Sequence, residues 1–99
     1  MPPECSAPEP AIDVVVVEAP ACHLCGDALR TLEQVGADYP LSVRRVDVAS
    51  TEGRAIVRRF RAPMPPVVTV DGELLGWGRL SRGKLRRRLD ELTTAGTAP

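Results

Sequence analysis

The hydrophobic pattern along the chain changes its period after the first segment. Residues 12–17 (IDVVVV) form a nearly unbroken β-branched run, which predicts a strand covered on both faces. Pro20 follows this run and is expected to end the strand. From Cys22 onward, apolar side chains recur every three or four residues, which predicts an amphipathic helix that Gly36 closes. The apolar positions of this helix are Leu24, Ala28, Leu29, Leu32 and Val35.

The middle of the chain repeats this alternation less regularly. Residues 41–48 (LSVRRVDV) predict a second strand, and its apolar phase slips between Val43 and Val46, which indicates an edge strand or a bulge. Ser50 or Thr51 is a suitable N-cap for a second helix. The inner face of that helix is predicted at Ile56, Val57 and Phe60, and the prolines at 63, 65 and 66 end it.

The last third of the chain predicts a hairpin and a helix. Residues 67–70 (VVTV) predict a third strand, Asp71-Gly72 a two-residue turn, and residues 73–77 the antiparallel partner. Ser81 is expected to cap a final helix with an apolar face at Leu85, Leu89 and Leu92. The order is therefore β-α-β-α-β-β-α, an α/β fold whose first two strands run parallel.

Length and composition limit the classes of protein that fit. A chain of 99 residues predicts one domain, which we place at residues 12–94. Residues 1–11 contain four prolines and are expected to be a disordered tail. The tail shows neither the basic residues nor the apolar run of a secretory signal, so we expect a cytoplasmic protein. No apolar run is long enough for a membrane span.

The charge balance argues against nucleic acid as the partner. Thirteen basic residues face thirteen acidic ones, so the formal net charge is zero, whereas a dedicated nucleic-acid binder shows a basic excess. Consecutive arginines spread around a helix, so we interpret the two arginine groups as solvated faces. These groups are Arg58, Arg59 and Arg61, and Arg86, Arg87 and Arg88.

The segment Cys22-His23-Leu24-Cys25 is the most informative feature of the sequence. It lies where the first strand's loop becomes a helix, and residues three apart share a helix face, so the two sulfurs can form a short disulfide. A helix N-terminus favours an anion, so Cys22 is expected to have a lowered pKa. Cys25 lies one turn further in and is expected to be more buried. We therefore predict that Cys22 attacks a substrate disulfide and that Cys25 resolves the mixed disulfide.

Other interpretations of these residues remain open. A structural zinc site needs four ligands, and the chain offers only Cys22, Cys25, Cys5 and His23, so we expect no metal. The two cysteines could also be simple core residues. A protonated His23 would stabilise the Cys22 thiolate, and an exposed neutral ring would have little effect. Cys5 is expected to be an exposed thiol of the tail.

Residues 22–25 and residues 65–73 (PPVVTVDGE) together carry a family resemblance. The chain resembles the glutaredoxin-like branch of the thioredoxin superfamily, a small bacterial type with a Cys-His-Leu-Cys motif, over residues 12–92. The resemblance implies a thioredoxin-like fold, with a four-stranded mixed sheet flanked by helices, and thiol–disulfide exchange. It also implies a cis-proline facing the cysteines, which is Pro66 here. Pro65 precedes it and has no N–H, so only its carbonyl can pair with a bound peptide.

The chain departs from the family pattern at three places. Glutaredoxins that use glutathione carry a basic residue shortly before the first cysteine, whereas residues 18–21 read EAPA. They also carry an acidic turn after the fourth strand, whereas residues 76–81 read GWGRLS. Both departures put glutathione in doubt as the reductant. Thioredoxins keep a buried aspartate six residues before the first cysteine, and that position is Val16.

The sequence thus predicts a dithiol–disulfide oxidoreductase that uses no cofactor and takes electrons from another thiol system. We expect protein or small-thiol disulfides as substrates, and a monomer. Besides the two cysteines, the expected substrate-contacting residues are Ala21, His23, Pro65, Pro66 and Trp77. Trp77 would form a wall of the substrate groove, with core packing or simple exposure as the alternatives. A non-catalytic binding module of the same fold, or a metal or iron–sulfur protein, is the alternative function.

Overall fold

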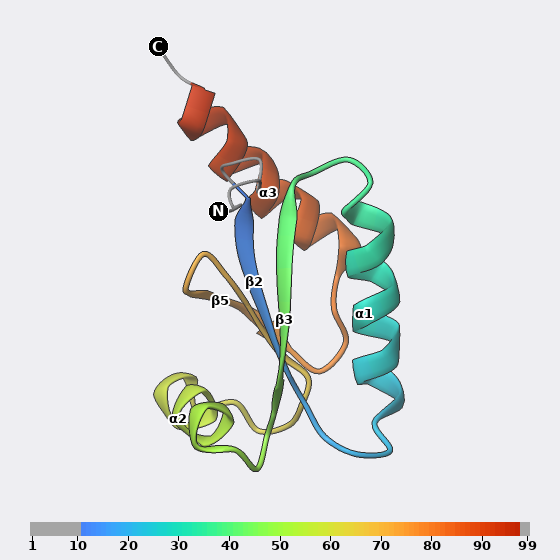
Figure 1. Cartoon of the computed structure of the whole chain (residues 1–99), viewed down its shortest axis with the longest axis vertical. Coiled ribbons are helices and arrows are strands. Elements are labelled where there is room, and N and C mark those ends of the chain that lie inside the picture. Colours follow the sequence, from blue (N-terminus) through green and yellow to red (C-terminus); the bar gives the residue numbers. More distant parts are fainter. Residues whose placement is uncertain (1–10, 98–99) are drawn as a thin grey trace, which may run out of the picture.

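The computed structural model describes residues 11–97, which form three helices around a mixed sheet of four strands (Figure 1). The predicted tail lies outside these residues, apart from Ala11, and so does Cys5. The predicted order of elements is confirmed. In chain order they are β2 (Ile12–Glu18), α1 (His23–Val35), β3 (Leu41–Asp47), α2 (Thr51–Phe60), β4 (Val67–Val70), β5 (Glu73–Trp77) and α3 (Arg82–Thr97).

Strand β2 is central in the sheet, whose order is β3-β2-β4-β5. It runs parallel to β3 and antiparallel to β4, with Val17 opposite Val46 on one side and Val67 on the other. Strand β3 is an edge strand with unbroken register, so the expected edge is confirmed and the alternative of a bulge there is wrong. The register shift occurs instead between β4 and β5, at Val68/Thr69.

The helices cover both faces of the sheet, with α1 and α3 on one face and α2 on the other (Figure 1). Two hydrophobic clusters follow from this arrangement, because successive side chains of a strand point to opposite faces. The larger cluster joins Val14 and Val16 of β2 to Leu32 of α1 and Leu85 of α3. In the smaller cluster, Ile56 and Val57 of α2 pack against buried residues that include Val17, Val46 and Val67. Phe60 is half-buried, and the Arg59 guanidinium lies over its ring, 4.7 Å from the centroid.

The turns follow the sequence closely, and the helix ends do so less closely. Asp71 and Gly72 both have positive φ, 55° and 82°, as a type I′ hairpin turn requires. Ser50 is the N-cap of α2, as predicted. Gly36 is the C-cap of α1, as predicted, and its φ of −61° is right-handed. Helix α3 continues to Thr97, beyond the last apolar position that predicted it.

Candidate active site

The two cysteines of the predicted motif lie at the carboxyl end of the central strand. Strand β2 ends at Glu18, and a short turn through Ala21, which has a φ of 54°, leads into α1. Cys22 is the N-cap of α1, with extended φ and ψ of −106° and 105°, and the helix begins at His23 rather than at Cys22 itself. Its sulfur is thereby held beside the first N–H groups of the helix, which have no partner within the helix backbone.

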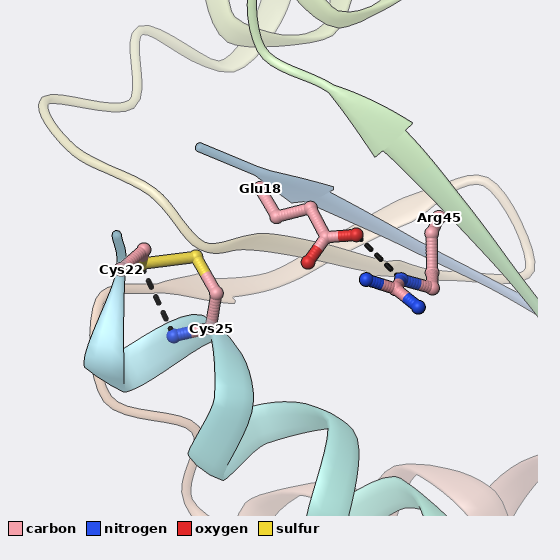
Figure 2. Close-up of a disulfide and its surroundings, with 4 residues drawn as sticks. All are labelled: Glu18, Cys22, Cys25 and Arg45. Carbon is pink, nitrogen blue, oxygen red and sulfur yellow. Dashed lines mark hydrogen bonds and ion pairs between the residues drawn. A yellow bond between two sulfur atoms is a disulfide. The ribbon is translucent and has the colours of Figure 1, made fainter. Parts of the chain in front are cut away.

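Cys22 and Cys25 form a disulfide, with their Cα atoms 5.2 Å apart (Figure 2). This separation lies in the ordinary range for a disulfide, so one helical turn brings the sulfurs together as the spacing predicted. The backbone N–H of Cys25 donates a hydrogen bond to Sγ of Cys22 at 3.1 Å. The same N–H would hold negative charge on that sulfur once the disulfide is reduced.

The two sulfurs differ in their access to solvent. Cys25 is buried, with 2% of its surface exposed, and it packs on the inner side of α1. Cys22 is half-buried at the start of the helix. Of the two sulfur-bearing residues, Cys22 is therefore the one that is more open to solvent.

A salt bridge between Glu18 and Arg45 lies beside the disulfide, and the sequence reasoning missed it. Nε of Arg45 donates to Oε2 of Glu18 at 2.6 Å, and this hydrogen bond raises the pKa of Arg45. The Glu18 carboxylate lies between the disulfide and the guanidinium (Figure 2), and only 19% of its side chain is exposed. Residues 18–21 contain no basic residue, but the fold brings the basic side chain of Arg45 to the site from β3. The alternation along β2 places residue 18 on the same face as Val14 and Val16, and this pattern indicates the position of Glu18.

The prolines before β4 lie at the same end of the sheet as the disulfide. The Pro65–Pro66 peptide bond is cis, as the family resemblance implied. Pro66 is buried, and its carbonyl accepts a hydrogen bond from the N–H of Gly78 at 2.9 Å. Pro65 is half-buried, and its carbonyl is left without a backbone partner within residues 11–97.

The remaining predicted contact residues lie on the surface. Ala21 and His23 are exposed on either side of Cys22. Trp77 is 46% exposed, which excludes core packing, and it lies opposite Val67 at the disulfide end of the sheet. It lines two adjoining hollows, of about 290 Å³ and about 650 Å³. Val16, at the position where thioredoxins keep an aspartate, is fully buried in the larger cluster.

The described residues contain no group of three or more side chains of the metal-ligating kinds placed to hold an ion. The fourth ligand that we considered for zinc, Cys5, lies outside them. Within the same part of the chain, every helix is too short or too polar to cross a membrane.

A sequence profile of the glutaredoxin-like domain (DUF836) matches residues 13–90, which span nearly the whole predicted domain. The chain belongs to this family. No curated protein matches the chain in sequence.

Solved structures give the fold of this glutaredoxin-like protein independently. Reduced thioredoxin pre-protein from Schistosoma mansoni has a TM-score of 0.60 at 21% identity, covering 82% of this chain and 78% of its own. Oxidised mitochondrial thioredoxin 3 from Saccharomyces cerevisiae has a TM-score of 0.60 at 19% identity, covering 84% and 80%. A protein of unknown function from Staphylococcus aureus has a TM-score of 0.59 at 16% identity, covering 84% and 92%. The fold is therefore thioredoxin-like, and it carries a cysteine pair at disulfide distance.

Proposed function

We propose that this protein is a dithiol–disulfide oxidoreductase, with Cys22 as the nucleophile and Cys25 as the resolving thiol. The observation that carries the proposal is the asymmetry of the pair. Cys22 caps α1, is accessible, and accepts the Cys25 N–H at 3.1 Å, whereas Cys25 is buried behind it. A thiolate at a helix N-terminus is the form that attacks disulfides.

The exchange begins with the reduced pair. The Cys22 thiolate attacks one sulfur of a substrate disulfide, forming a mixed disulfide and releasing the other substrate sulfur as a thiolate that takes up a proton. Cys25 then loses its proton to solvent and attacks Sγ of Cys22. The Cys22–Cys25 disulfide forms and the second substrate sulfur leaves as a thiolate. Two electrons have passed from the cysteine pair to the substrate, and an external dithiol or thiol must return them.

Substrate contacts are expected around the disulfide, where Ala21, His23, Pro65 and Trp77 reach the surface and the predicted contact residue Pro66 is buried. Pro65 has no N–H, so a bound peptide can pair there only with its carbonyl. We propose protein or small-thiol disulfides as substrates, a monomeric cytoplasmic protein, and an external thiol system as the electron source, with glutathione doubtful in that role. The doubt about glutathione rests on the turn after β5, where Arg79 stands in a segment without a carboxylate.

The decisive experiment measures the reduction potential of the Cys22–Cys25 pair in dithiothreitol or glutathione buffers, with free thiols counted by mass. We expect one two-electron transition between roughly −270 and −120 mV, the span of such motifs. In a second arm, Cys25→Ser should accumulate a mixed disulfide with a model substrate through Cys22, whereas Cys22→Ser should accumulate none. Failure to form the intramolecular disulfide at any potential, or stoichiometric metal in the purified protein, would contradict the proposal and favour a binding module.

A further inference from the structure

The two hollows beside Trp77 form one surface between strand β5 and helix α3. They share Leu75, Gly76, Trp77 and Lys84, so they are continuous along the strand. The smaller hollow extends into the turn at Arg79, and the larger one extends along α3 to Arg87 and Glu91. We call this surface the β5–α3 groove.

The β5–α3 groove carries an excess of unpaired positive charge. The side chains of Arg79, Lys84 and Arg87 are exposed and have no ion pair or hydrogen bond with any other residue of the described chain. Arg88 also lines the groove, but it is paired with Glu91 at 3.3 Å. Among the residues lining the groove, this leaves Glu73 as the unpaired carboxylate against three unpaired cations. The groove is therefore cationic although the whole chain has a formal net charge of zero.

The groove also follows a free sheet edge. Strand β5 is last in the order β3-β2-β4-β5, so its outer backbone groups pair with no other strand within residues 11–97. An exposed edge of this kind accepts an extended peptide as an additional strand, with hydrogen bonds from its backbone and specificity from nearby side chains. The middle of β5 carries Leu74, Leu75 and Gly76, which place no charge against such a peptide.

We propose that the β5–α3 groove binds an extended acidic segment of a protein partner, seated along β5 with its carboxylates toward Arg79, Lys84 and Arg87. The complementary charges attract the segment, and the exposed ring of Trp77 provides an apolar contact at one end. A protein segment fits better than nucleic acid, because Trp77 is the only aromatic residue lining the groove and single strands bind by stacking on several rings.

The groove ends at the same end of the sheet as the redox pair, so docking in it would bring a partner protein to the cysteines. Trp77 lies opposite Val67, directly after the cis-proline, and Gly78 donates its N–H to the Pro66 carbonyl. A partner seated along β5 would therefore present the adjoining part of its chain near Cys22. If the bound partner is also a substrate, the groove selects acidic substrate proteins, and this consequence rests on the proposed function. Binding of the acidic segment itself does not rest on it.

Trp77 is the only tryptophan in the chain, so its fluorescence reports directly on the groove. The titration uses the oxidised protein, in which no exchange takes place, and three 12-residue peptides: alternating Glu and Val, alternating Lys and Val, and alternating Ser and Val. We expect a saturable change with the acidic peptide alone, weakened at high salt. Equal binding of all three peptides, or none, would overturn the proposal. Tighter binding of oligo(dT) than of the acidic peptide would overturn it in favour of a nucleic-acid partner.

Charge reversal locates the binding. The double variant Arg79→Glu and Lys84→Glu should weaken acidic-peptide binding at least about fivefold. The matched control is the double variant Arg54→Glu and Arg58→Glu, because both residues are exposed cations on α2 whose side chains have no ion pair within the described residues. Thermal unfolding of each variant verifies that it is folded. An equal loss from this control would show non-specific attraction and would contradict the assignment, as would unchanged binding by the folded double variant of the groove.

Amide hydrogen exchange tests the seating along the strand. The acidic peptide should slow exchange of β5 amides that are not bonded to β4. Unchanged exchange in a saturated complex would contradict strand addition at this edge. Because both measurements use the oxidised protein, their failure is distinguishable from failure of the oxidoreductase proposal.

Discussion

Helices α1 and α2 both begin at the carboxyl end of one of the two parallel strands, and in both the N-cap side chain accepts a hydrogen bond from the N–H three residues later. At α1 the acceptor is Sγ of Cys22, 3.1 Å from the Cys25 nitrogen. At α2 it is Oγ of Ser50, 3.0 Å from the Gly53 nitrogen. The local backbone plan is the same, so the geometry of a capped first turn is not in itself a redox device.

The two helix starts differ in what stands three residues after the cap. Cys25 provides a second sulfur, so the cap atom of α1 has a partner with which to form a covalent bond. Gly53 is buried against the backbone of Asp47 and Val48, so the first turn of α2 is closed by packing. The chemistry at α1 therefore comes from two sulfur atoms placed on a backbone arrangement that α2 shares.

Neighbouring arginines of β3 serve the two helix starts separately. Arg44 and Arg45 point to opposite faces of the sheet, as successive strand residues do. Arg44 pairs with Glu52 in the first turn of α2, and Arg45 pairs with Glu18 beside the disulfide. Each helix start therefore has its own Arg–Glu pair, and the two pairs can be altered independently.

The largest effect is expected from adding one methyl group to each first turn. A Cβ on Gly53 would overlap the backbone oxygen of Asp47 and lie 3.0 Å from Cα of Val48, so Gly53→Ala should lower the free energy of unfolding by roughly 2 to 3 kcal/mol. The comparison change in α1 is Gly26→Ala, one position further from the cap, because Cys25 occupies the position that corresponds to Gly53. The added Cβ would lie 3.9 Å from Nη1 of Arg30, its nearest neighbour. That variant should be neutral or gain up to about 1 kcal/mol. Chemical denaturation of both oxidised variants measures this, and equal losses would show that the two turns are packed alike.

Replacing the N-cap side chain of either helix should have an intermediate effect on stability. Ser50→Ala should lower the free energy of unfolding by about 1 kcal/mol, and Ser50→Asp should restore it. Under reducing conditions, Cys22→Ser should be more stable than Cys22→Ala by a similar amount, because serine keeps the cap. Denaturant titrations in excess reductant test both helices. If Cys22→Ser and Cys22→Ala were equally stable, the Cys22 side chain would not be capping the reduced helix.

A smaller effect is expected from the charges beside the disulfide. Glu18→Gln leaves the Arg45 cation unpaired, which favours the Cys22 thiolate and so stabilises the reduced form. The reduction potential should become less negative, by up to about 30 mV. Arg45→Gln leaves the carboxylate unpaired and should shift the potential in the opposite direction. The thiol-counting titration measures both shifts, and Arg44→Gln, which alters only the α2 pair, is the control. Shifts of the same sign would disprove this electrostatic account.

The smallest effect is expected from protonating Glu52, which breaks its salt bridge with Arg44 at the start of α2. The hydrogen bond from Arg44 lowers the pKa of Glu52 below its usual 4.5. A carboxyl group with a lowered pKa in the folded state stabilises that state above pH 4.5, and the contribution is lost as the pH falls through the lowered value. Wild type should therefore exceed Glu52→Gln in stability near neutral pH, with the difference disappearing in acid. Both residues are exposed, so the difference is small. Unfolding measured from pH 2 to pH 7 tests it, and a difference that grows in acid would have the wrong sign.

Local patterns predicted most of the fold and the centre of the site. The β-branched run of β2, the helical spacing after Cys22 and the Asp71-Gly72 turn each determine structure within a few residues, and each was confirmed. The cis bond at Pro66 was predicted only through the family resemblance, because an isolated X–Pro bond favours the trans form.

Features that depend on tertiary contacts were not predicted. The pairing of Glu18 with Arg45 needs the register of β2 against β3, which a single sequence does not specify.

The end of α3 was missed for a different reason. Four of its last five residues, TTAGT, are threonine or glycine, which have low helix propensity, and the segment has no apolar periodicity, yet the helix runs through it to Thr97.

Strand β3 bears on how the protein behaves at high concentration. Its outer edge, opposite to that of β5, pairs with no other strand within residues 11–97, and an open row of backbone groups of this kind is the usual route to edge-to-edge aggregation. Arg44, Arg45 and Asp47 are exposed along this strand, and charged side chains on an edge strand oppose the addition of another strand because they would have to give up water. The same arginines that pair with Glu52 and Glu18 are therefore expected to disfavour fibril-like self-association.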